Sequence, residues 1–145
     1  MRLLLILMTS LLVSCGGSYQ ADFQKSKKQF KQVKSVEGPW KGTWKSEVNG
    51  HTGPVWSIVS QNKKDPKIWD FRYRAGWGVL QFGDYLHQVQ TKPNKDESLP
   101  LDAKMKLPNN FGTYAVKGTL TAKEFKVRYT GQGDKGTMTL SRPKK

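Results

Sequence analysis

The fold of this chain is decided by the stretch Gly38-Pro39-Trp40-Lys41-Gly42-Thr43-Trp44-Lys45-Ser46. Successive side chains of a β-strand point to opposite faces, so Trp40, Gly42 and Trp44 share one face of this strand. The lysines and Thr43 share the other face. An apolar face backed by a basic one is typical of an antiparallel strand that has a closed interior on one side and water on the other.

The chain after this stretch alternates in the same way, with turn signals between the alternating runs. Asn49-Gly50 favours a tight reversal because it accepts positive φ, and residues 75–78 predict a corner or bulge. No helical period appears after residue 35, so the pattern predicts an all-β fold, a sandwich or an up-and-down barrel. Closure would remove sheet edges, and we predict a single antiparallel up-and-down barrel of about eight strands. The predicted strands cover residues 39–48, 55–61, 67–74, 79–89 (with a bend at Gly83), 101–107, 113–120, 124–129 and 136–142.

The N-terminus has the pattern of a secretion leader. Met1-Arg2 is a short basic start, and the apolar run over 3–13 is too short for a stable membrane-spanning helix, which needs ~20 residues. Leu12-Val13-Ser14-Cys15 resembles the lipobox of bacterial lipoproteins. The resemblance implies that the leader, residues 1–14, is removed and that Cys15, the chain's single cysteine, carries fatty acyl chains such as palmitate. In that family an aspartate after the cysteine retains proteins in the inner membrane, so Gly16 implies the outer membrane in a host that has one.

Residues 15–36 are polar and basic, and they join the leader to the β-rich domain predicted over 37–145. We expect a flexible tether there, because the segment has few apolar residues. The alternative is a weak amphipathic helix over 21–34 with Phe23, Phe30 and Val33 on one face. Its lysines would then lie on acidic lipid headgroups and reinforce the anchor.

The chain is strongly basic, with 25 Lys and Arg against 11 Asp and Glu and a net charge of +14. Such a charge favours anionic partners, among them acidic lipids and envelope polysaccharides, and says nothing about the fold. Nucleic acid is not expected as a partner of a membrane-tethered, secreted domain. The cations that alternate with the apolar positions and would coat the outer wall are Lys41, Lys45, Arg72, Arg74, Lys126 and Arg128.

Gly38-x-Trp40 resembles the first-strand motif of the lipocalins and their relatives, the calycins. In that family the tryptophan plugs the closed end of an eight-stranded barrel, and a basic residue near the end of the last strand packs across the indole. The resemblance gives these roles to Trp40 and Arg142. Gly42-Thr43-Trp44 also resembles the first strand of avidin-type barrels, so the register between the two tryptophans stays open.

A barrel of this size has room for one small apolar ligand, or for none if its side chains fill it. Trp77 and Phe82, beside the glycine-rich corner, would flank the mouth. The aromatic residues expected to line the interior are Trp44, Trp56, Trp69, Phe71, Tyr73, Tyr114 and Tyr129.

Motifs for catalysis or metal binding are absent from the sequence. His51 and His87 are isolated, without the spacing of a zinc site, and no nucleophile elbow or phosphate loop occurs. We therefore expect a non-catalytic envelope lipoprotein without a cofactor or metal, which binds a small hydrophobic or amphipathic ligand inside the barrel. The alternative is an interaction module that contacts anionic lipid, polysaccharide or a protein partner through its basic outer surface.

Overall fold

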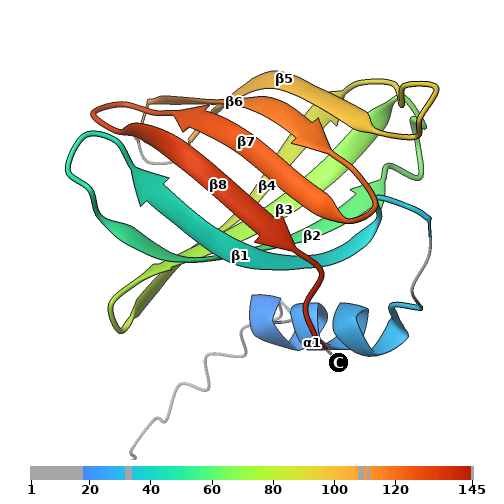
Figure 1. The fold of residues 1–145 in the computed structure, drawn as a ribbon, viewed down its shortest axis with the longest axis horizontal. Helices are drawn as coiled ribbons and strands as arrows, with labels where there is room; N and C mark the ends of the chain where they lie inside the picture. The colour runs from blue at the N-terminus through green and yellow to red at the C-terminus, as the bar shows by residue number, and fades with distance from the viewer. Residues whose placement is uncertain (1–17, 32–33, 108–109, 111, 145) are drawn as a thin grey trace, which may run out of the picture.

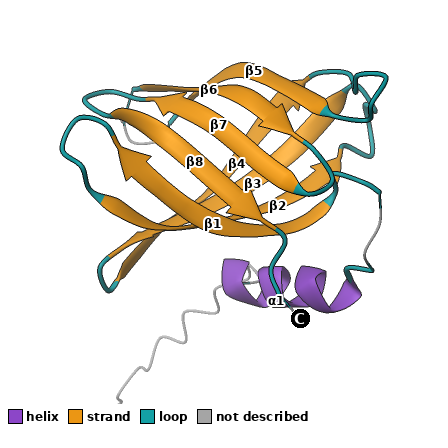
Figure 2. Ribbon diagram, viewed as in Figure 1, coloured by secondary structure: helices purple, strands orange, loops and turns teal. Residues whose placement is uncertain are grey.

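The computed structural model describes residues 18–31, 34–107, 110 and 112–144 as one helix followed by eight strands (Figures 1 and 2). The helix lies outside the barrel that the strands form. The elements are α1 (Tyr19–Gln29), β1 (Gly38–Ser46), β2 (Thr52–Gln61), β3 (Ile68–Trp77), β4 (Leu80–Gln90), β5 (Leu99–Lys106), β6 (Thr113–Leu120), β7 (Glu124–Thr130) and β8 (Lys135–Ser141).

The strands form one antiparallel sheet in the order β4-β3-β2-β1-β8-β7-β6-β5. Since β1 pairs with both β2 and β8, the first and last strands close the wall, and the seam falls between β4 and β5. The predicted all-β fold of eight antiparallel strands is confirmed, as a meander that forms a nearly closed barrel. The two edge strands, β4 and β5, lie next to each other across this seam, which lowers the risk of edge-to-edge aggregation.

The register of β1 places Trp40 fully inside, where it is 0 % exposed, and leaves Lys41 and Lys45 on the outer face. Gly42 is required between the two tryptophans because a Cβ there would collide with the backbone of Thr139 on β8. Glycine thus lets β1 and β8 approach closely at the position where the wall closes.

Two strand predictions differ from the structure in local detail. The corner or bulge predicted at residues 75–78 is a register shift between Tyr73 and Ala75, while β3 continues to Trp77 and the turn to β4 is made by Gly78 and Val79. Gly78 has a φ of +56°, which a glycine adopts at little cost. At the other edge of the sheet, β5 begins at Leu99 and includes Pro100. Proline is tolerated there because β5 pairs only with β6.

The N-terminal segment is also not a tether over residues 19–29, because α1 packs on the outside of β1, β2 and β3 (Figure 2). Tyr19 and Phe23 are buried against the barrel, 2 % and 3 % exposed. This helix has 11 residues and is shorter than the amphipathic alternative, and a helix of this length is marginal in isolation. Packing of two aromatic side chains on the barrel therefore stabilises it.

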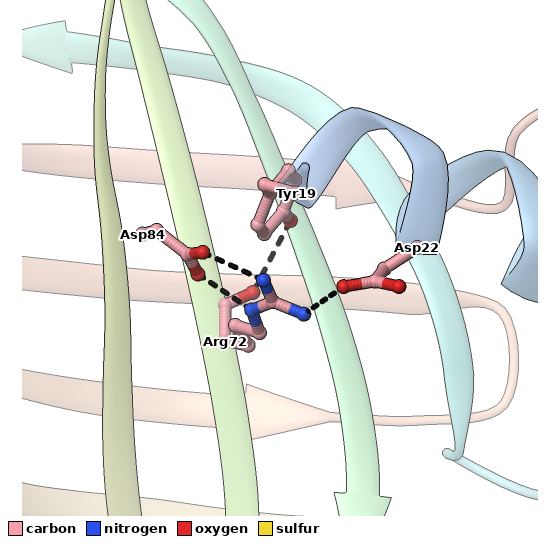
Figure 3. A network of polar contacts seen from close by, with 4 residues as sticks. All are labelled: Tyr19, Asp22, Arg72 and Asp84. Carbon is pink, nitrogen blue, oxygen red and sulfur yellow. Dashed lines mark hydrogen bonds and ion pairs between the residues drawn. The ribbon is translucent and has the colours of Figure 1, made fainter. Parts of the chain in front are cut away.

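An arginine on β3 holds the start of the helix (Figure 3). Arg72 forms ion pairs with Asp22 of α1 at 2.6 Å and with Asp84 of β4 at 2.5 Å. The Tyr19 hydroxyl donates to the Arg72 carbonyl oxygen at 3.2 Å, and the guanidinium lies over the Tyr19 ring. The hydrogen bonds from Arg72 lower the pKa of Asp84, so this carboxylate is ionised at neutral pH. The contacts of Arg72 with Asp22 and Tyr19 tie α1 to the barrel wall.

Candidate functional site: a cavity in one half of the barrel

One end of the barrel, called here the closed end, is formed by the start of β1, the β6–β7 turn and the residues after β8. Arg142 lies over the Trp40 indole at 3.7 Å, which is the contact that the calycin resemblance implied. The guanidinium also donates to the carbonyl oxygens of Ser35, Pro39 and Ala122. The Phe30 ring covers it from the other side at 4.4 Å.

Burial lowers the pKa of Arg142 to about 10, so the group still carries its charge at neutral pH. Below this lid the interior is solid. The rings of Trp40 and Phe125 meet edge to face at 5.9 Å, and Phe71 lies 5.8 Å from Phe125. Edge-to-face contacts of this kind add to the free energy gained by burial. No ligand fits between these rings.

The opposite half, called here the open end, contains a cavity of about 490 Å³. Its volume falls within the range of about 300–1,000 Å³ that is typical of small-molecule sites. Most of its lining side chains are aliphatic, aromatic or thioether groups. The lining residues are Trp44, Val55, Tyr73, Ala75, Phe82, Tyr85, Met105, Leu107, Tyr114, Tyr129, Gly131, Gln132, Asp134 and Met138.

The predicted interior residues separate into three groups. Trp44, Tyr73, Tyr114 and Tyr129 line the cavity. Trp69 and Phe71 point inward but belong to the solid core, and they do not line the cavity. The third group is Trp56 alone, which was predicted inside but lies on the outer face of β2.

Trp56 does not face the interior. Val55, Ser57 and Val59 are the inward, buried residues of β2, so Trp56 lies on the outer face, between Lys41 and Arg74 on the neighbouring strands. Alternation in β2 was misleading because both faces carry apolar side chains. The outer face is apolar there because α1 lies alongside it: Ile58 on this face borders a groove that is shared with Asp22 and Ser26.

Several lining residues were not predicted, namely Val55, Ala75, Tyr85, Met105, Leu107 and Met138. Alternation contained a signal for some of them. Tyr85 has the same parity as the buried residues His87 and Val89 of β4. Met105 continues the inward row of Leu101 and Ala103 on β5.

The polar groups of the cavity are mainly tyrosine hydroxyls. The Tyr114 hydroxyl reaches Met138 Sδ at 3.7 Å, and the Tyr129 hydroxyl donates to Asp134 Oδ2 at 2.9 Å. Burial raises the pKa of Tyr73, Tyr114 and Tyr129, so all three stay neutral at physiological pH. These hydroxyls can orient the polar end of an otherwise apolar ligand.

Asp134 is the only carboxylate among the described residues that line the cavity. Its Oδ1 accepts a hydrogen bond from Ser46 Oγ at 2.6 Å, and its Oδ2 accepts the bond from Tyr129. Asp134 therefore joins the β7–β8 turn to the end of β1. These hydrogen bonds fix the position of the Asp134 carboxylate.

The two residues expected at the mouth have separate roles. Phe82 lines the cavity. Trp77 lies on the hairpin beyond Phe82 and stacks on His51 of the β1–β2 loop, with ring centroids 5.0 Å apart.

The second histidine, His87, is buried at 1 % exposure, and burial lowers its pKa. In the described part of the chain, no three His, Cys, Asp or Glu side chains are grouped so that they could hold a metal ion.

The predicted basic surface is only partly available. Lys41, Lys45, Lys126 and Arg128 are exposed, but Lys126 pairs with Glu124 at 2.7 Å and Arg128 with Glu47 at 2.6 Å. The remaining two, Arg72 and Arg74, are half-buried beside Tyr19. Arg72 is engaged by two carboxylates, so it is a structural residue of the helix contact.

Cys15 and the leader lie outside the described residues. Within the described ranges, no helix combines the length and the apolar character that crossing a membrane requires. Comparison with protein-family models, with curated proteins and with solved structures gives no match to this chain. The geometry itself defines the class, a calycin-like barrel of eight antiparallel strands that is closed at one end and hollow at the other.

Proposed function

We propose that this protein is a lipid-anchored, non-catalytic envelope protein that binds a small hydrophobic or amphipathic ligand in the open-end cavity. The observation that carries the proposal is the cavity of about 490 Å³, which is walled by apolar side chains and tyrosine hydroxyls. An apolar ligand gains about 25 cal/mol for each Å² that it removes from water. The hydroxyls of Tyr73 and Tyr114 would bind its polar end.

The test is quenching of tryptophan fluorescence by brominated fatty acids at high salt. Trp44 lines the cavity, and its indole Nε1 donates to the Gly76 carbonyl oxygen at 2.9 Å, which holds the ring in place. Saturable quenching that is lost in Trp44→Phe is expected. High salt screens binding to the basic surface, so residual quenching reports the cavity.

A matched pair of substitutions locates the ligand. Ala75→Phe places a ring in the cavity, whereas Ala115→Phe makes the same change on β6 at a residue outside the cavity lining. We expect affinity to fall at least about tenfold in the first variant, the equivalent of 1.4 kcal/mol, and to stay unchanged in the second. Equal affinity in the two variants, or no saturable quenching in the unmodified protein, would reject the cavity as the ligand site.

The anchor is tested separately, because ligand binding and lipidation are independent properties. We infer from the lipobox-like Leu12-Val13-Ser14-Cys15 that Cys15 is acylated, and from Gly16 that the protein is directed to the outer membrane where the host has one. Radioactive palmitate should label the unmodified chain and not Cys15→Ala. Equal labelling of both chains would remove the anchor from the proposal.

A second candidate function is binding of anionic lipid or polysaccharide by the outer wall. It is favoured by Lys41 and Lys45, which are exposed on β1 and take part in none of the ion pairs formed within the described residues. Such binding is electrostatic, so it should weaken steeply as salt rises. Binding that does not respond to salt would exclude this candidate.

A further inference from the structure

The β3–β4 hairpin carries the most exposed apolar side chains of the described chain. Val79 at its turn is 99 % exposed, Leu80 is 61 % exposed, and Trp77 and Phe82 are about half exposed. Residues 75–83 contain no charged side chain, although the chain as a whole is strongly basic. A group of exposed apolar residues of this kind marks an interaction surface.

The hairpin continues the wall of the cavity. Residues directly opposite each other in an antiparallel pair point to the same side, and Ala75 pairs with Phe82, both of which line the cavity. Trp77 and Leu80 form the next such pair toward the turn, so they lie on the same face. An unbroken apolar row therefore leads from the cavity along the inner face of the hairpin to its tip.

The described chain begins beside this hairpin. Tyr19, the first residue of α1, packs under Arg72 and Arg74 of β3. Arg74 precedes Trp77 by three residues, about 10 Å along a strand. Cys15 precedes Ser18 by three residues, so the chain can separate the two by at most about 11 Å. An acyl anchor at Cys15 would thus attach close to the base of the hairpin.

Cations surround the same end of the barrel. Lys45, Lys106 and Lys135 lie at the ends of β1, β5 and β8 that border the open end, and all three are exposed. None of them joins an ion pair within the described residues. Apolar residues with a tryptophan at the centre and lysines around them fit the boundary of a bilayer with anionic headgroups.

We propose that the β3–β4 hairpin inserts its tip, Trp77–Phe82, into a lipid bilayer, so that the mouth of the cavity faces the membrane surface. The apolar inner face of the hairpin then gives an acyl chain a continuous path between the bilayer and the cavity. The inference concerns how the mouth meets a membrane and holds whether or not the cavity is loaded.

The experiment reports the depth of single positions in the full chain. The Cys15→Ser background contains no other cysteine, so Val79→Cys and Leu86→Cys each carry one thiol for an environment-sensitive NBD label. Leu86 is the matched control because it is exposed on β4, the strand that follows the turn, but faces outward, away from the cavity. Vesicles of phosphatidylcholine, with and without phosphatidylglycerol, are the probe.

A label at residue 79 is expected to brighten and shift to the blue on adding vesicles, more strongly with phosphatidylglycerol, whereas a label at residue 86 stays unchanged. Attachment through the N-terminal segment alone would bring neither label into the hydrocarbon. No change at residue 79, or equal changes at both positions, would overturn the proposal. A blue shift at residue 79 that needs no vesicles and grows with protein concentration would overturn it too, and would assign the hairpin to a second copy of the chain.

A charge at the tip tests the energetics. Val79→Asp should weaken partitioning into vesicles about tenfold, the cost of losing one buried valine side chain. Leu86→Asp should leave partitioning unchanged, and equal losses in the two variants would argue against insertion of the hairpin. Quenching by brominated fatty acid without vesicles reports the cavity independently, so failure of the hairpin proposal and failure of the ligand proposal are distinguishable.

Discussion

The closed end and the open end of this barrel are built from the same eight alternating strands, yet one is solid and the other is hollow. At the closed end, inward positions carry large side chains that touch one another, such as Trp40, Phe71 and Phe125. At the open end, Ala75 and Gly131 take inward positions and leave space.

The aromatic rings of the open end do not fill this space. Tyr114 and Tyr129 stack on each other, with centroids 6.0 Å apart and planes 19° from parallel, and so form part of the wall. An aromatic interior is thus compatible with a cavity when small residues alternate with the rings. The packed closed end therefore contributes most to stability, whereas the open end holds the cavity in which we propose a ligand binds.

The largest expected effect comes from emptying the closed end. Phe125 is fully buried among Trp40, Phe71 and Tyr73. Phe125→Ala should lower the free energy of unfolding by about 3–5 kcal/mol, because it creates a cavity that the surrounding rings cannot fill. Denaturant unfolding measures the loss. Phe82→Ala at the half-exposed mouth is the matched control, and a loss as large as that of Phe125→Ala would contradict the division between the two ends.

Removing the lid of the closed end should have a smaller effect. Arg142→Met removes three hydrogen bonds to carbonyl oxygens and the contact with the Trp40 indole. The substitution also removes the desolvation cost of the buried cation, which offsets part of the lost interactions. We therefore expect the free energy of unfolding to fall by about 2 kcal/mol. Arg128→Met, which breaks only an exposed ion pair with Glu47, should lose less than about 1 kcal/mol. Equal losses of unfolding free energy in the two variants would contradict the role of Arg142 as a stabilising lid over Trp40.

Releasing the helix should have a smaller effect still. Arg72→Met removes the ion pairs to Asp22 and Asp84, which are both partly exposed. Docking of α1 on the barrel should therefore become less favourable by about 1 kcal/mol. Trypsin cleavage after Lys25, Lys27 and Lys28 should then accelerate about fivefold, the rate factor that corresponds to this loss when cleavage requires undocking. Lys117→Met, which breaks an exposed pair with Asp102 far from α1, should leave cleavage unchanged.

The smallest effect at neutral pH is expected at the open end, where the tyrosines sense alkaline pH. Their pKa values are raised in the folded state, chiefly by burial, so the unfolded chain releases its protons first as pH rises through about 10. Their contribution to stability is complete below pH 10 and is lost as pH rises above it.

Tyr114→Phe should therefore have little effect on the free energy of unfolding at pH 7. Above pH 10 this free energy should fall less steeply with pH than in the unmodified protein, the slope differing by at most the contribution of one proton. Denaturant midpoints measured from pH 8 to pH 11.5 check this slope. Trp44→Phe, which changes the cavity wall without removing a titrating group, should keep the slope of the unmodified protein. Identical slopes for Tyr114→Phe and the unmodified protein would contradict burial of this hydroxyl.

Prediction from the sequence succeeded where one strand face was apolar and the other polar. Trp69, Phe71 and Tyr73 alternate with charged residues on β3, and all three are buried inside. It failed at Trp56, because β2 has apolar side chains on both faces and alternation alone cannot say which face is covered by α1. The helix was only the alternative to a flexible tether, because a segment of this length depends for its stability on burial of Tyr19 and Phe23, which local sequence does not reveal.

The sequence by itself determined the all-β class, the approximate number of strands and the alternation, because each depends on local spacing. The calycin resemblance pointed to Trp40 and Arg142, and the structure decided between Trp40 and Trp44. Only the tertiary structure decided which half of the barrel is hollow, since a cavity is what remains after residues from many strands have packed. It also decided that Arg72 serves the helix contact through Asp22 and Asp84. A charged side chain is available to a ligand only when no carboxylate of its own fold reaches it first, and that depends on contacts between residues up to 81 positions apart.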